Sequence, residues 1–258
     1  MKFGHRQPVS GGCIHRCYRV PEGFLKVNDA RHVDAFAAEA DGLAALRAAG
    51  CAVPKPVEHG VDGGDGYLLL EWLDLGAAGD FASLGRMLAR LHGSTGERFG
   101  WARDNYIGAT RQSNGRTDDW KTFWLEQRMA PQLELARRNG HRVDPLLDRA
   151  CDLLDGHAPQ PSLVHGDLWS GNVGFTAEGP VMFDPAVYYG DREVDLAMTE
   201  LFGGFPPAFY SAYGPLPAGY ETRKHLYNLY HLLNHLNLFG GGYLAQVKAT
   251  LGLLRRAL

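Results

Sequence analysis

Three short polar side chains and a histidine stand at fixed spacing past the middle of this chain. The segment HGDLWSGN carries His165, Asp167 and Asn172, and Asp184 follows in VMFDPA. Phosphoryl transfer needs a carboxylate that accepts the proton of an attacking hydroxyl and oxygen ligands for magnesium beside the phosphates. The order H-x-D-x-x-x-x-N with a later Asp has the spacing of kinase catalytic loops. These residues therefore predict half of a phosphotransferase site.

Each residue type suits one part of this chemistry. Magnesium prefers oxygen ligands and keeps much of its water, so Asn172 and Asp184 are the expected metal ligands. A second carboxylate must stay free of the metal and face the acceptor hydroxyl, which makes Asp167 the expected base. His165 is expected to support the loop structurally.

A β-hairpin is expected to bring the two metal ligands together. Residues 172–184 read NVGFTAEGPVMFD, two apolar runs around a turn at residues 176–179. If Phe175 pairs with Val181, Asn172 stands directly opposite Asp184. Residues opposed in an antiparallel pair lie ~5 Å apart at their Cα atoms.

An upstream lysine and glutamate are expected to hold the phosphates of ATP. Lys26 lies in FLKVN on a predicted strand, and a helix predicted over residues 30–49 places Glu39 in its apolar stripe. A carboxylate there needs a cationic partner. The simplest candidate is Lys26, which would form the phosphate-binding Lys–Glu pair found in kinases. The alternatives are a solvent-facing Lys26 and a Glu39 that only reaches the rim of its stripe.

Two further segments are expected to line the nucleotide. The strand within YLLLEWLDL leaves its sheet at Glu71, Trp72 and Leu73, where free backbone groups can hold the adenine edge. The turn in VSGGCI presents Gly11 and Gly12 as a phosphate loop.

The rest of the chain is expected to be mainly helical around the hairpin. Apolar stripes and end signals predict helices over residues 80–91, after Asp118 and Asp119, and over residues 145–154. The boundary between a β-rich lobe and this helical lobe is expected just after residue 73.

Composition narrows the class of protein. The 258 residues can bury a core, and 26 basic against 29 acidic residues give a net charge of -3, without the footprint of a nucleic-acid-binding protein. The N-terminus lacks the apolar core of a signal peptide, and no run approaches the ~18 apolar residues of a membrane span. We therefore expect a soluble, cytoplasmic protein with reduced cysteines and with neither a nucleic-acid nor a membrane partner.

With these motifs in hand, the chain resembles the fructosamine and ketosamine kinases, relatives of the aminoglycoside and choline phosphotransferases. The resemblance runs through SGGCI, FLKVN, AEADGL, LLLEWLDL, FGWARDNYIGAT, HGDLWSGN, FDPAVYYGDREVDLAM and HLNLFGGGYL. It implies an α+β, two-lobed protein-kinase-like fold, with a small antiparallel β lobe carrying one helix at residues 1–73 and a larger, mostly helical lobe at residues 74–258.

The resemblance also implies an activity. The expected enzyme uses ATP and Mg²⁺ to phosphorylate the sugar 3-hydroxyl of ribulosamines, erythrulosamines or fructosamines on lysine or protein, which leads to deglycation. Glycated protein or a glycated amine is then the expected partner. Because the first loop is not G-x-G-x-x-G and Pro185 stands where protein kinases have glycine, their lobe-closing mechanics are not expected here.

Several residues are expected in supporting roles. Resemblance to kinases assigns Asp195 to the backbone of the catalytic loop, with an exposed Asp paired to Arg192 as the alternative. Trp169 lies inside the catalytic loop and is expected to line the substrate, with Asp104 and Asn105 as hydrogen-bonding candidates beside the acceptor.

Other side chains are assigned to packing or to the helix ends. Asp191 is expected to cap the helix that begins in YYGDREVDLAM. We expect core packing for the side chains of Trp101, Trp120, Trp124, His231 and His235.

Two competing functions and one question of assembly stay open at the level of sequence. A kinase of the aminoglycoside or choline type is the nearer rival, and a non-catalytic nucleotide-binding module is the more distant one. The chain is expected to be a monomer, or a dimer joined by a disulfide through Cys13, whose thiol would lie among phosphate-loop N–H groups.

Overall fold

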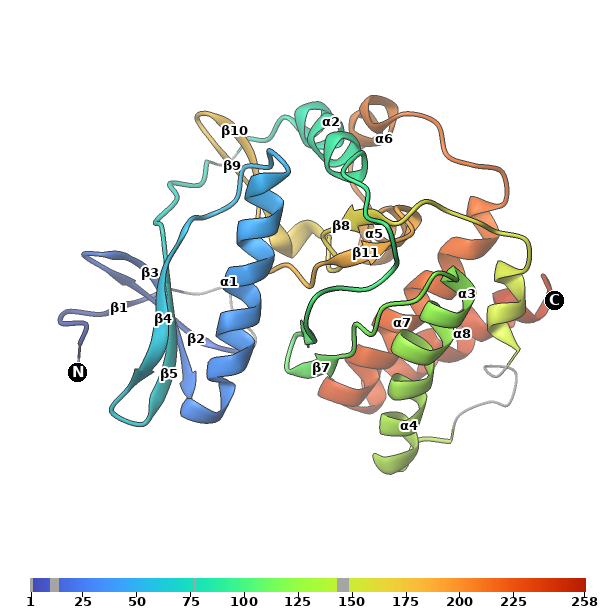
Figure 1. Cartoon of the computed structure of the whole chain (residues 1–258), viewed down its shortest axis with the longest axis horizontal. Helices are drawn as coiled ribbons and strands as arrows, with labels where there is room; N and C mark the ends of the chain where they lie inside the picture. Colours follow the sequence, from blue (N-terminus) through green and yellow to red (C-terminus); the bar gives the residue numbers. More distant parts are fainter. Residues whose placement is uncertain (1, 10–13, 77, 143–148) are drawn as a thin grey trace.

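The computed structural model describes residues 2–9, 14–76, 78–142 and 149–258, which fold into two lobes (Figure 1). The N-terminal lobe is an antiparallel sheet in the order β1-β2-β3-β5-β4. Its strands are β1 (Gln7–Pro8), β2 (Arg16–Val20), β3 (Gly23–Asp29), β4 (Pro56–Asp62) and β5 (Asp65–Leu70). The predicted β-rich lobe is therefore present.

The β2–β3 hairpin depends on a glycine. Gly23 has a φ of +148°, and a Cβ there would stand 2.1 Å from the carbonyl oxygen of Leu70 on β5. Only glycine tolerates both the positive φ and this close approach. The hairpin places Lys26 in the middle of β3, paired with Cys17 on β2 and Leu68 on β5.

One long helix crosses this sheet. A short 3-10 turn, η1 (Ala30–His32), leads into α1 (Val33–Ala48), which occupies the predicted helical segment. Phe36, Leu43 and Leu46 are fully buried on its inner face, and the Glu39 side chain is only 12% exposed. Glu39 thus lies within the apolar stripe, where the 3.6-residue period places it.

The second lobe is mainly helical. Its helices are α2 (Phe81–His92), α3 (Trp120–Phe123), the π-helix η2 (Trp124–Met129), α4 (Ala130–Arg138), the 3-10 turns η4 (Ala150–Leu154), η5 (Ser170–Asn172) and η6 (Gly241–Tyr243), α5 (Glu193–Leu201), α6 (Pro207–Tyr213), α7 (Tyr220–Phe239) and α8 (Leu244–Arg255). Three two-stranded sheets complete it, formed by β6 (Asn105–Ile107) with β7 (Thr110–Gln112), β8 (Ser162–Val164) with β11 (Tyr188–Gly190), and β9 (Val173–Thr176) with β10 (Gly179–Met182).

Two predicted helices of this lobe differ in detail. The helix after Asp119 is continuous but passes through a π-helical stretch at η2. Of the helix predicted over residues 145–154, the first part lies outside the described residues, and the described part is a 3-10 turn at Ala150–Leu154.

The two lobes share apolar packing. One buried cluster joins Phe36 and Leu43 of α1 to Leu88 of α2, Leu163 of β8 and Leu196 of α5. A second cluster lies within the helical lobe around Trp124 and the adjoining helices. Because α1 belongs to the first lobe but also packs against the second, the lobes are not separated by a gap in packing. The boundary after residue 73 therefore stays a prediction.

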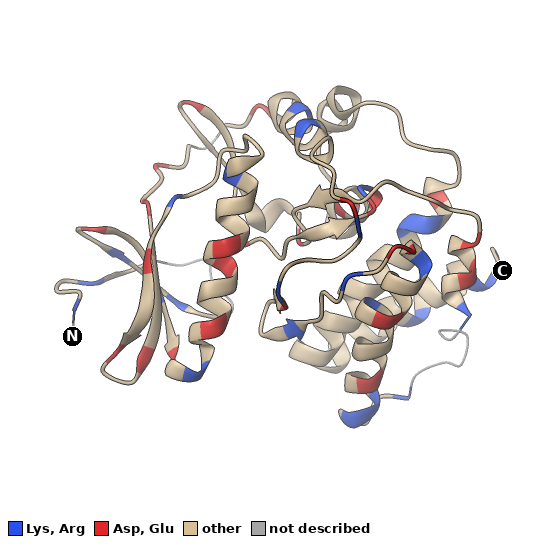
Figure 2. Ribbon diagram, in the orientation of Figure 1, with Lys and Arg blue, Asp and Glu red and all other residues tan. Residues whose placement is uncertain are grey.

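Charged residues are interspersed over both lobes (Figure 2). Within the described ranges, no helix combines the length and the apolar character that crossing a bilayer requires.

Candidate active site

The loop that carries the predicted catalytic residues runs between β8 and β9 and contains a buried histidine. His165 is fully buried, and its Nε2 lies 3.0 Å from the carbonyl oxygen of Phe183. Because that carbonyl can only accept, Nε2 carries the proton, and Nδ1 accepts the N–H of Asp167 at 3.3 Å. Burial lowers the pKa of His165, which keeps the ring neutral for both contacts. This is the supporting position predicted for it.

A buried carboxylate fixes the start of the same loop. Asp195 on α5 accepts the backbone N–H of His165 at 2.7 Å and that of Gly166 at 2.8 Å, and His92 lies 3.0 Å from it. Asp195 is 1% exposed, so the alternative of a solvent-facing residue paired with Arg192 is wrong. The contact with the loop backbone has the form expected by resemblance.

Asp167 lies in the same loop, two residues after His165. The Nδ2 group of Asn172 donates to the backbone oxygen of Asp167 at 2.8 Å and to its Oδ2 at 3.1 Å. Burial, and next the charge of Asp184, raises the pKa of Asp167 to about 7. A carboxylate with a pKa near neutrality suits general-base chemistry, because it binds a proton more strongly than an ordinary aspartate does.

Lys26 lies beside the metal-ligand candidate from the other lobe. Its Nζ is 2.7 Å from Glu39 Oε1 and also forms an ion pair with Asp184. Desolvation alone would lower the pKa of Lys26, but the charges of Asp184 and Glu39 raise it above its usual value. The ammonium therefore stays charged, and the predicted pairing with Glu39 is present.

The hairpin that carries Asp184 has a different register from the one predicted. Pro180, not Val181, pairs with Phe175, and Asn172 stands beside Phe183, whose N–H donates to the Asn172 carbonyl at 3.1 Å. The turn is one residue tighter than expected because Thr176 and Gly179 pair directly, and two-residue turns fit antiparallel strands well.

Backbone conformation, not strand pairing, places Asp184. Its φ is +55°, the one positive value outside glycine among the described residues. Asn and Asp tolerate this region better than most residues, and such strain concentrates at functional sites. The turn at Asp184 directs its carboxylate to Lys26 and close enough to Asp167 to raise the pKa of the Asp167 carboxyl group.

The donor set suits a hard cation. Both described hydrogen bonds of the Asn172 amide use Nδ2, and none from the described residues reaches its Oδ1. The carboxylate of Asp184 is 47% exposed. One amide oxygen and one partly open carboxylate, completed by phosphate oxygens and water, form a reasonable magnesium site.

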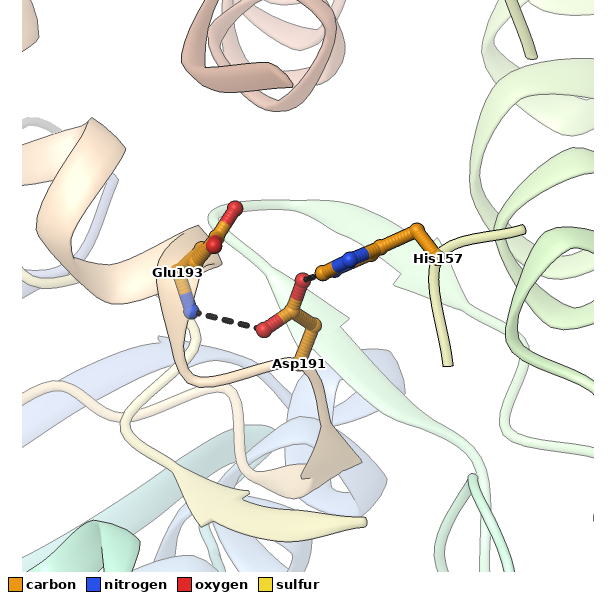
Figure 3. Close-up of side chains that lie close together, drawn as sticks. All are labelled: His157, Asp191 and Glu193. Atoms are coloured by element: carbon orange, nitrogen blue, oxygen red, sulfur yellow. Dashed lines mark hydrogen bonds and ion pairs between the residues drawn. The ribbon is translucent and has the colours of Figure 1, made fainter. Parts of the chain in front are cut away.

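A second cluster has metal-ligand residue types but a structural role (Figure 3). His157, Asp191 and Glu193 offer ligand atoms within 4.8 Å of one another. Asp191 accepts hydrogen bonds from the Tyr227 hydroxyl, the Glu193 N–H and His157, while Arg223 holds the Glu193 carboxylate through two nitrogens. These partners satisfy the oxygens. The predicted cap differs by one residue, because Arg192 is the N-cap of α5 without a side-chain cap hydrogen bond, while Asp191 just before it accepts the N–H of Glu193.

The connector expected at the adenine leaves the sheet where predicted, because β5 ends at Leu70. The N–H of Glu71 donates to the Lys55 carbonyl, and the Trp72 indole donates to Asp74 at 2.8 Å. In the described part of the chain, no hydrogen bond uses the backbone of Trp72 or Leu73, which leaves these groups for a nucleotide. Gly11, Gly12 and Cys13 lie outside the described residues.

Of the three substrate candidates, Trp169 and Asp104 keep accessible surface and Asn105 does not. Trp169 is half-buried beside Phe202. Asn105 is 4% exposed, donates to the Val187 carbonyl and accepts from two neighbouring amides, so its assignment to substrate is corrected to a scaffold role. Asp104 accepts the Asn114 N–H with one oxygen and pairs with Arg111 through the other, so its substrate role stays a prediction without support from these contacts.

Two features of the site escaped sequence reasoning. Trp101 packs partly buried against the core, as expected, but its indole also donates to Asp41 of α1 at 2.7 Å, and nearby Tyr106 donates to Asp34 of the same helix. These bonds attach α1 to the second lobe. His231 was expected only to pack, yet its Nδ1 lies 3.9 Å from Asp167 Oδ1 and has no hydrogen-bond partner among the described residues. Local periodicity contains no signal for either contact.

This chain is similar to known proteins in both sequence and fold. The family model for fructosamine kinase matches residues 1–256. A probable ketoamine kinase from Synechocystis is 50% identical, covering 97% of this chain and 90% of the relative. The chloroplastic protein-ribulosamine 3-kinase of Arabidopsis thaliana is 41% identical, covering 91% and 78%. A solved structure of a fructosamine-3-kinase candidate from Haemophilus somnus superposes with a TM-score of 0.90 at 30% identity, covering 98% and 91%.

Proposed function

The chain belongs to the fructosamine kinase family, and on that premise we propose that it phosphorylates the sugar 3-hydroxyl of ketosamines carried by lysine side chains or proteins. As a family member it is an ATP-dependent kinase with an alcohol group as acceptor. The observation that supports this chemistry most directly is the assembly of Asp167, Asn172, Asp184 and Lys26 around one point from both lobes.

Asp167 is the proposed catalytic base. It accepts the proton of the sugar hydroxyl as the hydroxyl oxygen forms its bond to the γ-phosphorus and the bond to the ADP oxygen breaks. Asn172 orients the Asp167 carboxylate through Oδ2, and Asp195 holds the backbone two residues earlier. Both contacts fix the base before the acceptor arrives, which lowers the entropy cost of reaching a reactive geometry.

Lys26 is the proposed phosphate ligand of the small lobe. Glu39 fixes its ammonium, and α1 is itself attached to the second lobe through Trp101 and Asp41. The lysine therefore has a defined position relative to the base on the opposite lobe. The backbone of Trp72 and Leu73 is proposed to hold the adenine edge.

Asn172 Oδ1 and the Asp184 carboxylate are the proposed ligands of Mg²⁺, which when bound neutralises charge on the transferring phosphate. The product carries a phosphate beside the ketone of the sugar. We expect this phosphoketosamine to decompose and release the free amine, so that the reaction removes a glycation adduct.

A phosphorylation panel tests the proposal. Ribulosyl-, erythrulosyl- and fructosyl-lysine are supplied with ATP and Mg²⁺ beside kanamycin and choline, and Asp167→Asn serves as the inactive control. ATP-dependent phosphate incorporation into at least one ketosamine is expected. Phosphorylation of kanamycin or choline without any ketosamine would reassign the enzyme to the small-molecule kinases, and nucleotide binding without any transfer would indicate a non-catalytic module.

A further inference from the structure

Aromatic rings form a continuous row that starts inside the catalytic loop. The Trp169 ring lies 5.9 Å from that of Phe202, which follows α5, and Phe202 lies 5.0 Å from His235 on α7. His235 in turn contacts Phe239 at 5.5 Å and Tyr243 at 5.0 Å. Each ring touches the next at a distance typical of aromatic pairs. We call these five residues the aromatic row.

The row is partly exposed to solvent, most of all at its far end. All five side chains keep some exposure, and Phe239 at its far end is 49% exposed. By contrast, Trp120 and Trp124 of the same lobe are buried in the core. Phe239 and the partly exposed rings beside it therefore offer apolar surface to a ligand.

Glycines flank the row on both sides. Gly203 and Gly204 follow Phe202 directly, and Gly240, Gly241 and Gly242 separate Phe239 from Tyr243. A Cβ added at any of these five positions would meet nothing within 4 Å. The space at these five glycines is therefore open, and another backbone can approach the chain closely there.

The near end of the row adjoins the reacting centre. Trp169 is two residues from Asp167, and the ring of Trp169 lies over Gly171 of the same loop. His231, one helical turn before His235 on α7, approaches Asp167 Oδ1 at 3.9 Å. The row thus leads from the neighbourhood of the proposed base, Asp167, outward along the last turns of α7.

A ketosamine has a direction that matches this path. Its 3-hydroxyl must face Asp167, while the substituent on its amine extends away from the sugar. The amine is a secondary ammonium, which is attracted to the face of a tryptophan. For a glycated lysine, the substituent on the amine is the methylene stem of the lysine, followed by the polypeptide backbone. Lysine stems are apolar and pack along apolar surface, which includes aromatic rings.

We propose that the aromatic row binds the lysine stem and flanking backbone of a glycated polypeptide. This assignment rests on the proposed ketosamine kinase activity and makes protein-bound ketosamines, rather than free small ones, the substrates that the enzyme binds best. Phe239 and Tyr243 contact the polypeptide beyond the lysine stem and take no part in phosphoryl transfer.

The test compares two acceptors that differ only beyond the amine. One is a ribulosylated lysine within a peptide, and the other is the ribulosamine of methylamine. Phe239→Ala and Tyr243→Ala are expected to raise KM for the peptide at least threefold while kcat stays unchanged, because binding away from the reacting atoms is lost. Both variants should leave KM for the methylamine adduct unchanged. Leu253→Ala on α8, which also removes an exposed apolar side chain, is the matched control and should change neither KM.

The outcomes separate this inference from the function on which it rests. Equal KM values in the variants and the wild type for the peptide, or equal changes for both acceptors, would overturn the aromatic row as a polypeptide site while leaving the kinase assignment intact. If neither acceptor is phosphorylated by the wild type, the ketosamine activity itself fails, and this inference fails with it. Light scattering of wild type and Phe239→Ala gives a further check, since a dimer that dissociates in the variant would make the row a contact between copies of the chain.

Discussion

The carboxylate of Asp195 accepts the backbone N–H of His165 at 2.7 Å, two residues before the proposed base. One buried side chain thereby fixes the main chain of the catalytic loop from a different element, α5. Asp195 is 1% exposed and also contacts Gly166 N and His92, so both of its carboxylate oxygens have hydrogen-bond partners. Loop geometry and fold stability are coupled at this residue.

Asp195→Asn is expected to lower both stability and activity. The amide presents a donor where two backbone N–H groups already donate, so at least one buried group loses its partner, at a cost of about 1–3 kcal/mol. Thermal unfolding should show a lower Tm at pH 7, and kcat should fall with it. Asp118→Asn, which removes an exposed carboxylate paired with Arg98, is the control and should change neither quantity. Wild-type kinetics in Asp195→Asn would contradict the positioning role.

The same residue should govern part of the stability at acid pH. Burial alone would raise the pKa of Asp195, but the hydrogen bond and charge of His92, with His165 and the Gly166 N–H, bring it below its usual value. A depressed pKa adds stability above the unfolded pKa of about 3.9, and this stability is lost as pH falls through the folded pKa. The Tm of Asp195→Asn should therefore decline less steeply than that of wild type below pH 4. Parallel curves for the two proteins would refute the linkage.

Replacing Lys26 should be costly because its partner is buried. Lys26→Met leaves Glu39 without its cation, and breaking a buried pair in this way costs about 3–5 kcal/mol. KM for ATP should also rise, since the proposed phosphate ligand is gone. The double variant Lys26→Met, Glu39→Leu should lose less stability than the two single losses added together. The control is Lys2→Met, whose ion pair with Glu58 is exposed and should contribute little to stability.

Asp184→Asn separates metal binding from folding. Asp184→Asn and Asp184→Ala both remove the ion pair with Lys26, but asparagine accepts the φ of +55°, so Asp184→Asn should keep a higher Tm than Asp184→Ala, which adds roughly 1–2 kcal/mol of backbone strain. Loss of a carboxylate ligand should raise the Mg²⁺ concentration for half-maximal activity at least about tenfold. Calorimetric titration with Mg²⁺ and ADP reads the metal affinity without turnover. An unchanged Mg²⁺ requirement would exclude Asp184 as a ligand.

Asp167→Asn should lower the activity of the enzyme and raise its stability. Removal of a general base lowers kcat by ~10²- to 10⁴-fold. The pKa of about 7 means that the folded state binds this proton more tightly than the unfolded chain, so stability present at low pH is lost as pH rises through 7. The neutral amide avoids that loss. Without nucleotide and metal, the Tm difference in favour of the variant should therefore grow from pH 5 to pH 8, and a constant difference would argue against the raised pKa.

Much of the site follows from local sequence rules. The spacing of His165, Asp167 and Asn172 identifies the loop because one short segment carries all three. Helical periodicity places Glu39 in the apolar stripe of α1, and a buried carboxylate requires a cation, which makes Lys26 its partner. Strand and turn signals also place the end of β5 and the connector after it.

Only the tertiary structure decided where these segments meet. The register of β9 and β10 depends on a turn that is one residue tighter than the pattern suggests, and the direction of Asp184 depends on a positive φ that no residue pattern announces. Asn105 became part of the scaffold, and His231 came to lie beside Asp167, through contacts between residues distant in the chain. Sequence patterns report periodicity and short-range turn chemistry, whereas these contacts arise from packing between elements, which local rules do not encode.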